Sequence, residues 1–202
     1  GFKAGLCLAP CACEMKSEIC LKHFDWLLKV NGGPWACGNN WGGFYALDID
    51  NPEVQEYLRS VFDRVFNEWG FDLVKLDFLY AAAPYGNERE SRAARMTRAM
   101  EMIREWCGDK LVLGCGVPLM PAFGYVDYCR IGPDVTLNAK GDIQSRMLHR
   151  ERCSTVHAIA NAIYRRQLNG REFSHDPDVF LLRDRNIKLS WKDKRNLACV
   201  KA

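Results

Sequence analysis

The chain has 202 residues, a formal net charge of +3, 48% hydrophobic residues and 26% charged residues. This length suits one sizeable domain, and this composition is typical of a globular protein and excludes a disordered one. The small net charge, spread without a basic stripe, argues against nucleic-acid binding. No apolar run reaches the roughly 18 residues that would predict a membrane span.

From the N-terminus, the sequence predicts strands and helices in alternation. The expected elements of the first half are an apolar strand over 2–9, a helix over 16–28, a Gly/Asn/Trp-rich loop over 31–43, an extended segment over 44–47, a helix over 52–69 and a strand over 71–77. Asn51 is suited to cap the second helix, whose first position is Pro52, and Gly70 is suited to end it.

The second half continues the same alternation. Its expected elements are a helix over 88–106, strands over 110–114 and 125–131, a long helix over 142–168 with a break before Ser154, a short strand over 171–174 and a final helix over 191–202. Apolar strands separated by amphipathic helices predict a parallel sheet covered on both faces. The sheet could be an open doubly wound one or part of a (β/α)8 barrel. The Gly114-Cys115-Gly116 segment has only the first glycine pair of a dinucleotide-binding turn. It is therefore only weak evidence for the open doubly wound sheet.

The ten cysteines do not resemble a disulfide framework. Most lie in apolar runs, where a free cysteine behaves as a small buried hydrophobe. The N-terminal group lacks the paired C-x-x-C spacing of zinc sites; it consists of Cys7, Cys11, Cys13 and Cys20. We therefore expect free thiols, no metal, and a reducing cytoplasmic location.

Polar side chains stand where the predicted strands end, which is where barrel enzymes place their catalytic groups. These positions are Glu14, Asp48, Asp77, Cys115, Asp134 and Asp178. For any one acidic residue, capping the next helix is the simpler interpretation. Asp77 differs, because Lys75 lies two residues before it and shares its face of the strand, whereas Val74, Leu76 and Phe78 form the apolar face. The pair is either a structural salt bridge or a sugar-binding lysine beside an ionised carboxylate, which a glycosidase nucleophile requires.

Asp134 is the candidate second carboxylate, because Gly132 and Pro133 stop its strand abruptly. A general acid must carry a proton near neutral pH, whereas Arg130 favours the ionised form. Burial and repulsion from Asp77 would raise the pKa of Asp134, and Arg130 would lower it. The sequence leaves open which of these effects is larger. If Asp77 and Asp134 form the pair, retention of configuration requires carboxyl groups about 5–5.5 Å apart.

Several segments together resemble the α-galactosidases of glycoside hydrolase family 36, in the melibiase-like clan. In order they are GFKAGL at 1–6, LAP at 8–10, YALD at 45–48, NPEV at 51–54, VKLDF at 74–78, LGCGVPL at 113–119, RIGPD at 130–134 and DPD at 176–178. The resemblance implies a partial (β/α)8 barrel, roughly its third to seventh strand units. It would form one incomplete catalytic domain over 1–202, lacking the first two strands, the last strand and the flanking β-domains. It also implies that this piece alone is poorly active.

The resemblance also implies a role for each matched residue. Asp77 would be the nucleophile and Asp134 the acid/base of a retaining enzyme that removes terminal α-linked galactose from oligosaccharides. The matched sugar-binding positions are Lys75, Arg130, Asp178, Cys115 and Gly116. Apart from the motifs, Trp35 and Trp41 could form a stacking platform, although packing within their own loop explains them equally well. His175 replaces the family's usual Asn. No cofactor is implied, and the full-length protein could form a homo-oligomer.

Two alternatives stay open at this point. On the same scaffold, the chain could be an α-N-acetylgalactosaminidase or a galactosyl transferase, and residues 115–119 would decide between an N-acetyl group and a hydroxyl at C2. Outside catalysis, it could be a carbohydrate-binding barrel that has lost turnover. The presence of both Asp77 and Asp134 favours an enzyme.

Overall fold

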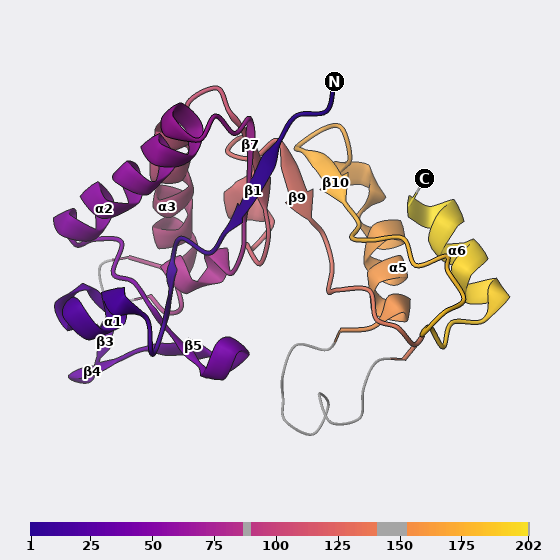
Figure 1. The fold of residues 1–202 in the computed structure, drawn as a ribbon, viewed down its shortest axis with the longest axis horizontal. Helices are drawn as coiled ribbons and strands as arrows, with labels where there is room; N and C mark the ends of the chain where they lie inside the picture. The colour runs from indigo at the N-terminus through magenta and orange to yellow at the C-terminus, as the bar shows by residue number, and fades with distance from the viewer. Residues whose placement is uncertain (87–89, 141–152, 202) are drawn as a thin grey trace. The chain divides into compact units, whose positions relative to one another are not determined.

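A computed structural model describes residues 1–86, 90–140 and 153–201 of the chain, which divides into two units, Gly1–Asp127 and Tyr128–Ala202 (Figure 1). Both units are mixed α/β, with parallel strand pairing. Neither unit contains a closed barrel within its described residues, so the barrel and its strand numbering stay a prediction, as does the single incomplete domain over 1–202.

The first unit is built on parallel strands in the order β1 (Gly5–Leu8), β7 (Leu73–Leu76) and β8 (Leu111–Gly114). The register places Lys75 of β7 between Cys7 and Leu113. On the other face of β7, Val74 and Leu76 are fully buried. The alternation that the sequence predicted for this strand is therefore confirmed.

A smaller antiparallel sheet lies in the same unit, in the order β2 (Ala12–Glu14), β6 (Phe44–Ala46) and β5 (Ala36–Gly38), and β3 (Lys29–Val30) pairs with β4 (Gly33–Pro34). The extended segment over 44–47 is thus present but does not join the parallel strands. Placing Glu14 and Asp48 among the barrel strand ends was wrong for this reason: both belong to the antiparallel sheet or follow it.

Helix α2 (Pro52–Asp63) begins as predicted, because the Asn51 side chain accepts a hydrogen bond from the Glu53 N–H at 2.9 Å. A π-helical turn, Arg64–Glu68, extends it to Gly70, whose φ is 71°. Helix α3 (Arg92–Cys107) contacts α2 (Figure 1), and its residues Met96, Met100 and Ile103 are buried.

The helix predicted over 16–28 is mostly wrong. The structure has a short helix, α1 (Glu18–Lys22), and then a 3-10 turn, Phe24–Trp26. His23 interrupts the helix, with φ −128° and ψ 57°. The break lets Trp26 turn into the core, where its indole N–H donates to Glu53 of α2 at 2.8 Å. Tertiary packing has overridden local helix preference here.

The second unit pairs β9 (Tyr128–Arg130) in parallel with β10 (Ser174–Asp176) and adds α5 (Thr155–Tyr164) and α6 (Trp191–Lys201). The predicted break before Ser154 is confirmed, because Ser154 caps α5 by accepting from the His157 N–H. Residues 142–152 of the predicted long helix lie outside the described residues. The strand predicted over 171–174 begins later, at Ser174, because Gly170 N–H bonds to the Phe173 carbonyl and holds 170–173 in a turn.

None of the ten cysteines takes part in a disulfide in the part of the chain that the structure describes. Cys7 and Cys199 are exposed, however, and do not serve as buried hydrophobes. Cys7 lies on the face of β1 opposite Leu6 and Leu8, beside Lys75. In the part of the chain that the structure describes, no helix combines the length and apolar character needed to cross a membrane.

Candidate active site

The carboxyl end of β7 presents Asp77. Its backbone N–H continues the ladder to β1 by donating to the Leu8 carbonyl at 2.7 Å. Its side-chain Oδ1 accepts the N–H of Phe78 at 2.8 Å. Lys75 and Asp77 are both partly exposed, as a shared open face requires. The ion pairs between described residues do not include one that joins Lys75 to Asp77, so the structural salt bridge is not formed.

Phe78 leaves the strand in the left-handed conformation, with φ 53° and ψ 32°. Its ring makes edge contacts with three aromatic side chains: Trp41 at 4.9 Å, Phe44 at 5.2 Å and Tyr80 at 6.2 Å between centroids. The sequence placed Phe78 on the helix-facing side with Val74 and Leu76, and this was wrong, because the positive φ turns the residue away from the strand's alternation.

The end of β8 lies against this turn. Cys115, which is buried, donates its N–H to the Leu76 carbonyl at 2.8 Å, and the Gly116 carbonyl accepts the Tyr80 N–H at 2.9 Å. Gly116 has φ 63°, and a Cβ built there would lie 3.3 Å from the backbone N and Cα of Phe78. The structure thus brings Cys115 and Gly116 beside the Asp77–Phe78 turn.

Trp41 joins the same cluster from the loop before β6. It adopts a left-handed backbone, with φ 57°, and keeps 58% of its surface exposed. Its ring is therefore supported from behind by Phe78 and Phe44 and open on the outside. This arrangement suits a stacking surface for a flat apolar ligand face.

In the second unit, Arg130 holds three carboxylates. Its side chain is 8% exposed and bonds Asp134 at 2.6 Å, Asp176 at 3.0 Å and Asp178 at 2.8 Å. Of the three, Asp134 is 63% exposed, whereas Asp178 is 9% exposed. Asp134 is therefore the carboxylate that solvent or a ligand reaches, and the other two fix the guanidinium from behind.

Asp178 is also tied to the loop that carries Asp134. Its second oxygen accepts the Val135 N–H at 2.6 Å, and its own N–H donates to Asp176 at 2.9 Å from a backbone with φ 70°. The DPD motif at 176–178 includes Asp176, but it predicted a role for Asp178 alone. The sequence feature that could have pointed to Asp176 is its position two residues before Asp178. In the structure it lies at the end of β10, in register with Arg130 of β9.

His175 faces away from this carboxylate cluster, since it alternates with Asp176 on β10. Its Nε2 is buried without a hydrogen-bond partner among the described residues. Burial lowers the pKa of His175, and the positive charge of Arg165 lowers it further. The replacement of Asn by His at this position therefore alters packing on the opposite side of the strand from Asp176.

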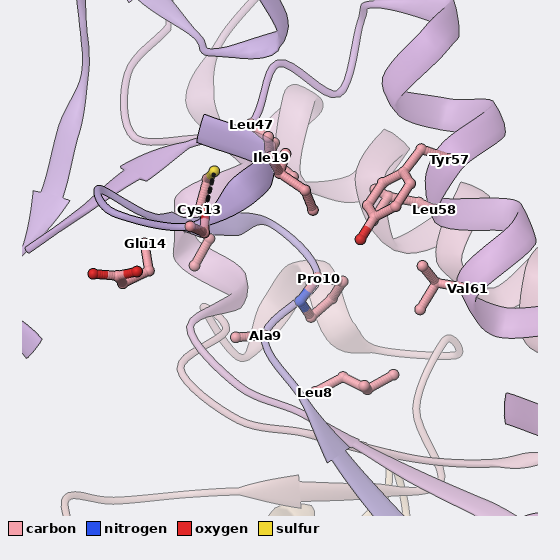
Figure 2. A pocket seen from close by; sticks show the side chains of 12 residues that line it. Leu8, Ala9, Pro10, Cys13, Glu14, Ile19, Leu47, Tyr57, Leu58 and Val61 are labelled. Carbon is pink, nitrogen blue, oxygen red and sulfur yellow. Dashed lines mark hydrogen bonds between the residues drawn. The ribbon is translucent and has the colours of Figure 1, made fainter. Parts of the chain in front are cut away.

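Figure 2 shows a pocket of about 280 Å³ elsewhere in the first unit, between the segment after β1, α1 and α2. Its lining is mostly apolar and includes Pro10, Ile19, Tyr57, Leu58 and Val61. None of the predicted sugar-binding or catalytic residues lines it. A second pocket, of about 410 Å³, is lined by Tyr80, Arg92 and Met96, among others, and so adjoins the Phe78 turn.

The fold and these motifs have counterparts among solved structures. The chain is 34% identical to TtGalA, an α-galactosidase from Thermus thermophilus in complex with p-nitrophenyl α-D-galactopyranoside, with a TM-score of 0.85 over 96% of this chain and 40% of that one. TtGalA in complex with stachyose matches at 35% identity and a TM-score of 0.86, over 99% of this chain and 44% of that one. No protein-family model matches the chain.

A more distant likeness shows the fold alone. A variant of the glycoside hydrolase family 36 α-galactosidase AgaA from Geobacillus stearothermophilus, in complex with 1-deoxygalactonojirimycin, is 16% identical, with a TM-score of 0.52 over 100% of this chain and 31% of that one. The α/β class of the chain is therefore that of glycosidase domains. More particularly, the chain is related to the α-galactosidases, and the resemblance that its motifs predicted is confirmed. It spans 40–44% of the length of the first two relatives.

Proposed function

We propose that the chain forms part of the catalytic domain of a retaining α-galactosidase, in which Asp77 is the nucleophile. The observation that carries this proposal is the setting of Asp77: a carboxylate at the carboxyl end of a parallel strand, oriented by the Phe78 N–H at 2.8 Å and sharing an open face with Lys75. Parallel strands of a (β/α)8 barrel present their catalytic groups at this end. In the proposed barrel, β1, β7, β8, β9 and β10 are the third to seventh strands.

The proposed reaction is a double displacement. The Asp77 carboxylate attacks the anomeric carbon of a terminal α-linked galactose, and the carboxylic acid of Asp134 protonates the departing glycosidic oxygen. A covalent glycosyl-aspartate forms. Asp134, now ionised, takes a proton from a water molecule that attacks the same carbon, releases galactose and restores Asp77.

The remaining matched residues bind the sugar or position a residue that binds it in this proposal. Lys75 and Arg130 donate to hydroxyl groups, and the backbone and side chain at Cys115 and Gly116 border the 2-hydroxyl. Asp178 holds Arg130 in place, which its 9% exposure and 2.8 Å ion pair support. The exposed ring of Trp41 stacks on the next sugar of the oligosaccharide. Stachyose in the TtGalA complex supports galacto-oligosaccharides as the substrate class. The free cysteines support a reducing compartment such as the cytoplasm.

A chimera tests this function directly. The chain replaces its matching segment in TtGalA, and turnover of p-nitrophenyl α-D-galactopyranoside is measured before and after Asp77→Asn. We expect the chimera to turn over and the substitution to abolish turnover by about 10³-fold or more, because the nucleophile is removed.

Asp72→Asn is the matched control, because Asp72 precedes the opposite end of the same strand and is half-exposed. It should leave turnover within about twofold of the chimera's, since it touches no reacting atom. A folded chimera that binds the substrate without turning it over would instead support the non-catalytic carbohydrate-binding alternative.

A further inference from the structure

One buried cation in the first unit lies outside the residues that the proposed reaction uses. The Arg95 side chain, on α3, is 7% exposed. Its guanidinium bonds Asp48 at 2.9 Å and Asp50 at 2.8 Å, and its Nε donates to the Ala82 carbonyl at 3.1 Å. A buried charge is costly unless it is paired and hydrogen-bonded, and these contacts provide both.

The third contact connects Arg95 to the candidate nucleophile. Ala82 ends the 3-10 turn Leu79–Ala82, which begins directly after Phe78. Within the turn, Ala81 N–H bonds the Phe78 carbonyl at 3.0 Å. Because so short a turn has few freely rotating bonds, a shift at Ala82 is passed to Phe78, whose N–H orients Asp77.

From this chain of contacts we propose that Arg95 is a positioning residue, which fixes the turn after β7 and thereby the orientation of the Asp77 carboxylate. The inference rests on the proposed function for the role of Asp77. Arg92, one helical turn earlier, supports the same segment by donating to the Ala83 carbonyl at 3.2 Å. Arginine suits the position because a planar fork reaches acceptors in several directions at once, which the single ammonium of lysine does not.

Arg98 offers a matched control on the same helix. It lies three residues after Arg95, is 38% exposed, and bonds Asp50 and Glu90. Arg95 and Arg98 therefore share Asp50 as a partner, but the described hydrogen bonds to the Ala82 and Ala83 carbonyls come from Arg95 and Arg92.

The test compares Arg95→Met with Arg98→Met in the 202-residue chain by amide hydrogen exchange. We expect R95M to speed exchange of the Phe78 and Tyr80 amides by about tenfold, the effect of losing one buried hydrogen bond, and R98M to change it by less than about twofold. The amides of Leu58 and Ile103 report the rest of the unit and should not change. Equal effects of R95M and R98M on Phe78 and Tyr80 would overturn the proposal.

Arg95→Lys covers the case in which R95M does not fold. Lysine keeps the charge beside Asp48 and Asp50 but cannot also hold the Ala82 carbonyl, so faster exchange confined to Phe78 and Tyr80 is expected. Wild-type exchange in R95K would contradict the proposed role.

A second readout separates positioning from a general structural role. In the chimera with TtGalA, a fluorinated galactosyl fluoride labels the candidate nucleophile, and the dependence of the labelling rate on its concentration gives a half-saturating concentration and a maximal rate. We expect R95K to lower the maximal rate about tenfold or more and to leave half-saturation unchanged, because Arg95 does not touch the sugar. A chimera that carries the wild-type segment and is never labelled would contradict the proposed function, while amide exchange would still decide the role of Arg95.

Discussion

The backbone N–H of Phe78 donates to the carboxylate of the residue before it, Asp77, at an N···Oδ1 distance of 2.8 Å. Phe78 reaches this geometry in a left-handed conformation, φ 53°, which costs an L-residue roughly 1–2 kcal/mol. The aromatic contacts of its ring with Trp41, Phe44 and Tyr80 hold it there. Strain of this kind is typical of sites where a side chain must be aimed.

The close approach of Gly116 to Phe78 should make Gly116→Ala costly. A Cβ there lies 3.3 Å from the Phe78 backbone and also requires a positive φ of 63°. Gly124 has a similar φ of 80° but open space around its Cβ position. Gly124→Ala therefore measures the cost of the positive φ alone, about 1 kcal/mol. We expect G116A to lower the free energy of unfolding, measured in urea, by at least about 1 kcal/mol more. Equal losses would show that the contact with Phe78 is unimportant.

Trp41 and Trp69 allow a test of the stacking surface, because they are 58% and 57% exposed. Only Trp41 belongs to the aromatic cluster around Phe78. We expect Trp41→Ala to weaken stachyose binding by about threefold to tenfold, the range of one aromatic contact, and Trp69→Ala to leave it unchanged. Calorimetric titration measures both. Unchanged affinity in W41A would assign Trp41 to packing within its own loop.

Asp178 should matter more for stability than Asp134, although both bond Arg130. Asp178 is 9% exposed and also accepts the Val135 N–H, whereas Asp134 is 63% exposed. Asp178→Asn, which tolerates the positive φ, should lower the free energy of unfolding by about 1.5–3 kcal/mol. Asp134→Asn should cost less than about 1 kcal/mol. Thermal denaturation of both variants measures the two losses. A larger loss for Asp134→Asn than for Asp178→Asn would contradict the greater burial of Asp178.

His175 should make the second unit less stable in mild acid. Its pKa lies below the ordinary value of 6.5 because burial disfavours the charged ring. The unfolded chain therefore binds the proton more readily, so stability that is present above about pH 6.5 falls as the pH is lowered towards the folded pKa. Comparing unfolding of the wild type and His175→Gln at pH 7.5 and 5.5 isolates this contribution. Between pH 7.5 and 5.5 the wild type should lose more stability than H175Q. Equal losses would show that His175 is not a source of the acid sensitivity.

Local rules predicted those parts of the fold that depend on short-range patterns. The alternation of β7, the Asn51 cap and the Ser154 break are set within a few residues, and each is confirmed. The positions that failed depend on distant partners. Trp26 leaves the expected helix to bond Glu53, and the 44–46 strand pairs with β2 and β5 and not with β7.

In the candidate site, too, the residues within motifs could be predicted, whereas those that depend on distant partners could not. The motifs predicted roles for Asp77, Asp134 and Arg130 but none for Asp176, because the sharing of one guanidinium among three carboxylates exists only once β9 and β10 pair. Nor could spacing reveal Arg95, which reaches Asp48 and Ala82 across the fold.

The most direct measurement of the central claim is the site of covalent labelling by a fluorinated galactosyl fluoride in the chimera with TtGalA, mapped by peptide mass spectrometry. A retaining mechanism with Asp77 as nucleophile predicts one glycosyl adduct, on the peptide containing Asp77, which disappears in Asp77→Asn and persists in Asp72→Asn. An adduct on another carboxylate, or sugar binding with no adduct under conditions that label TtGalA, would contradict it.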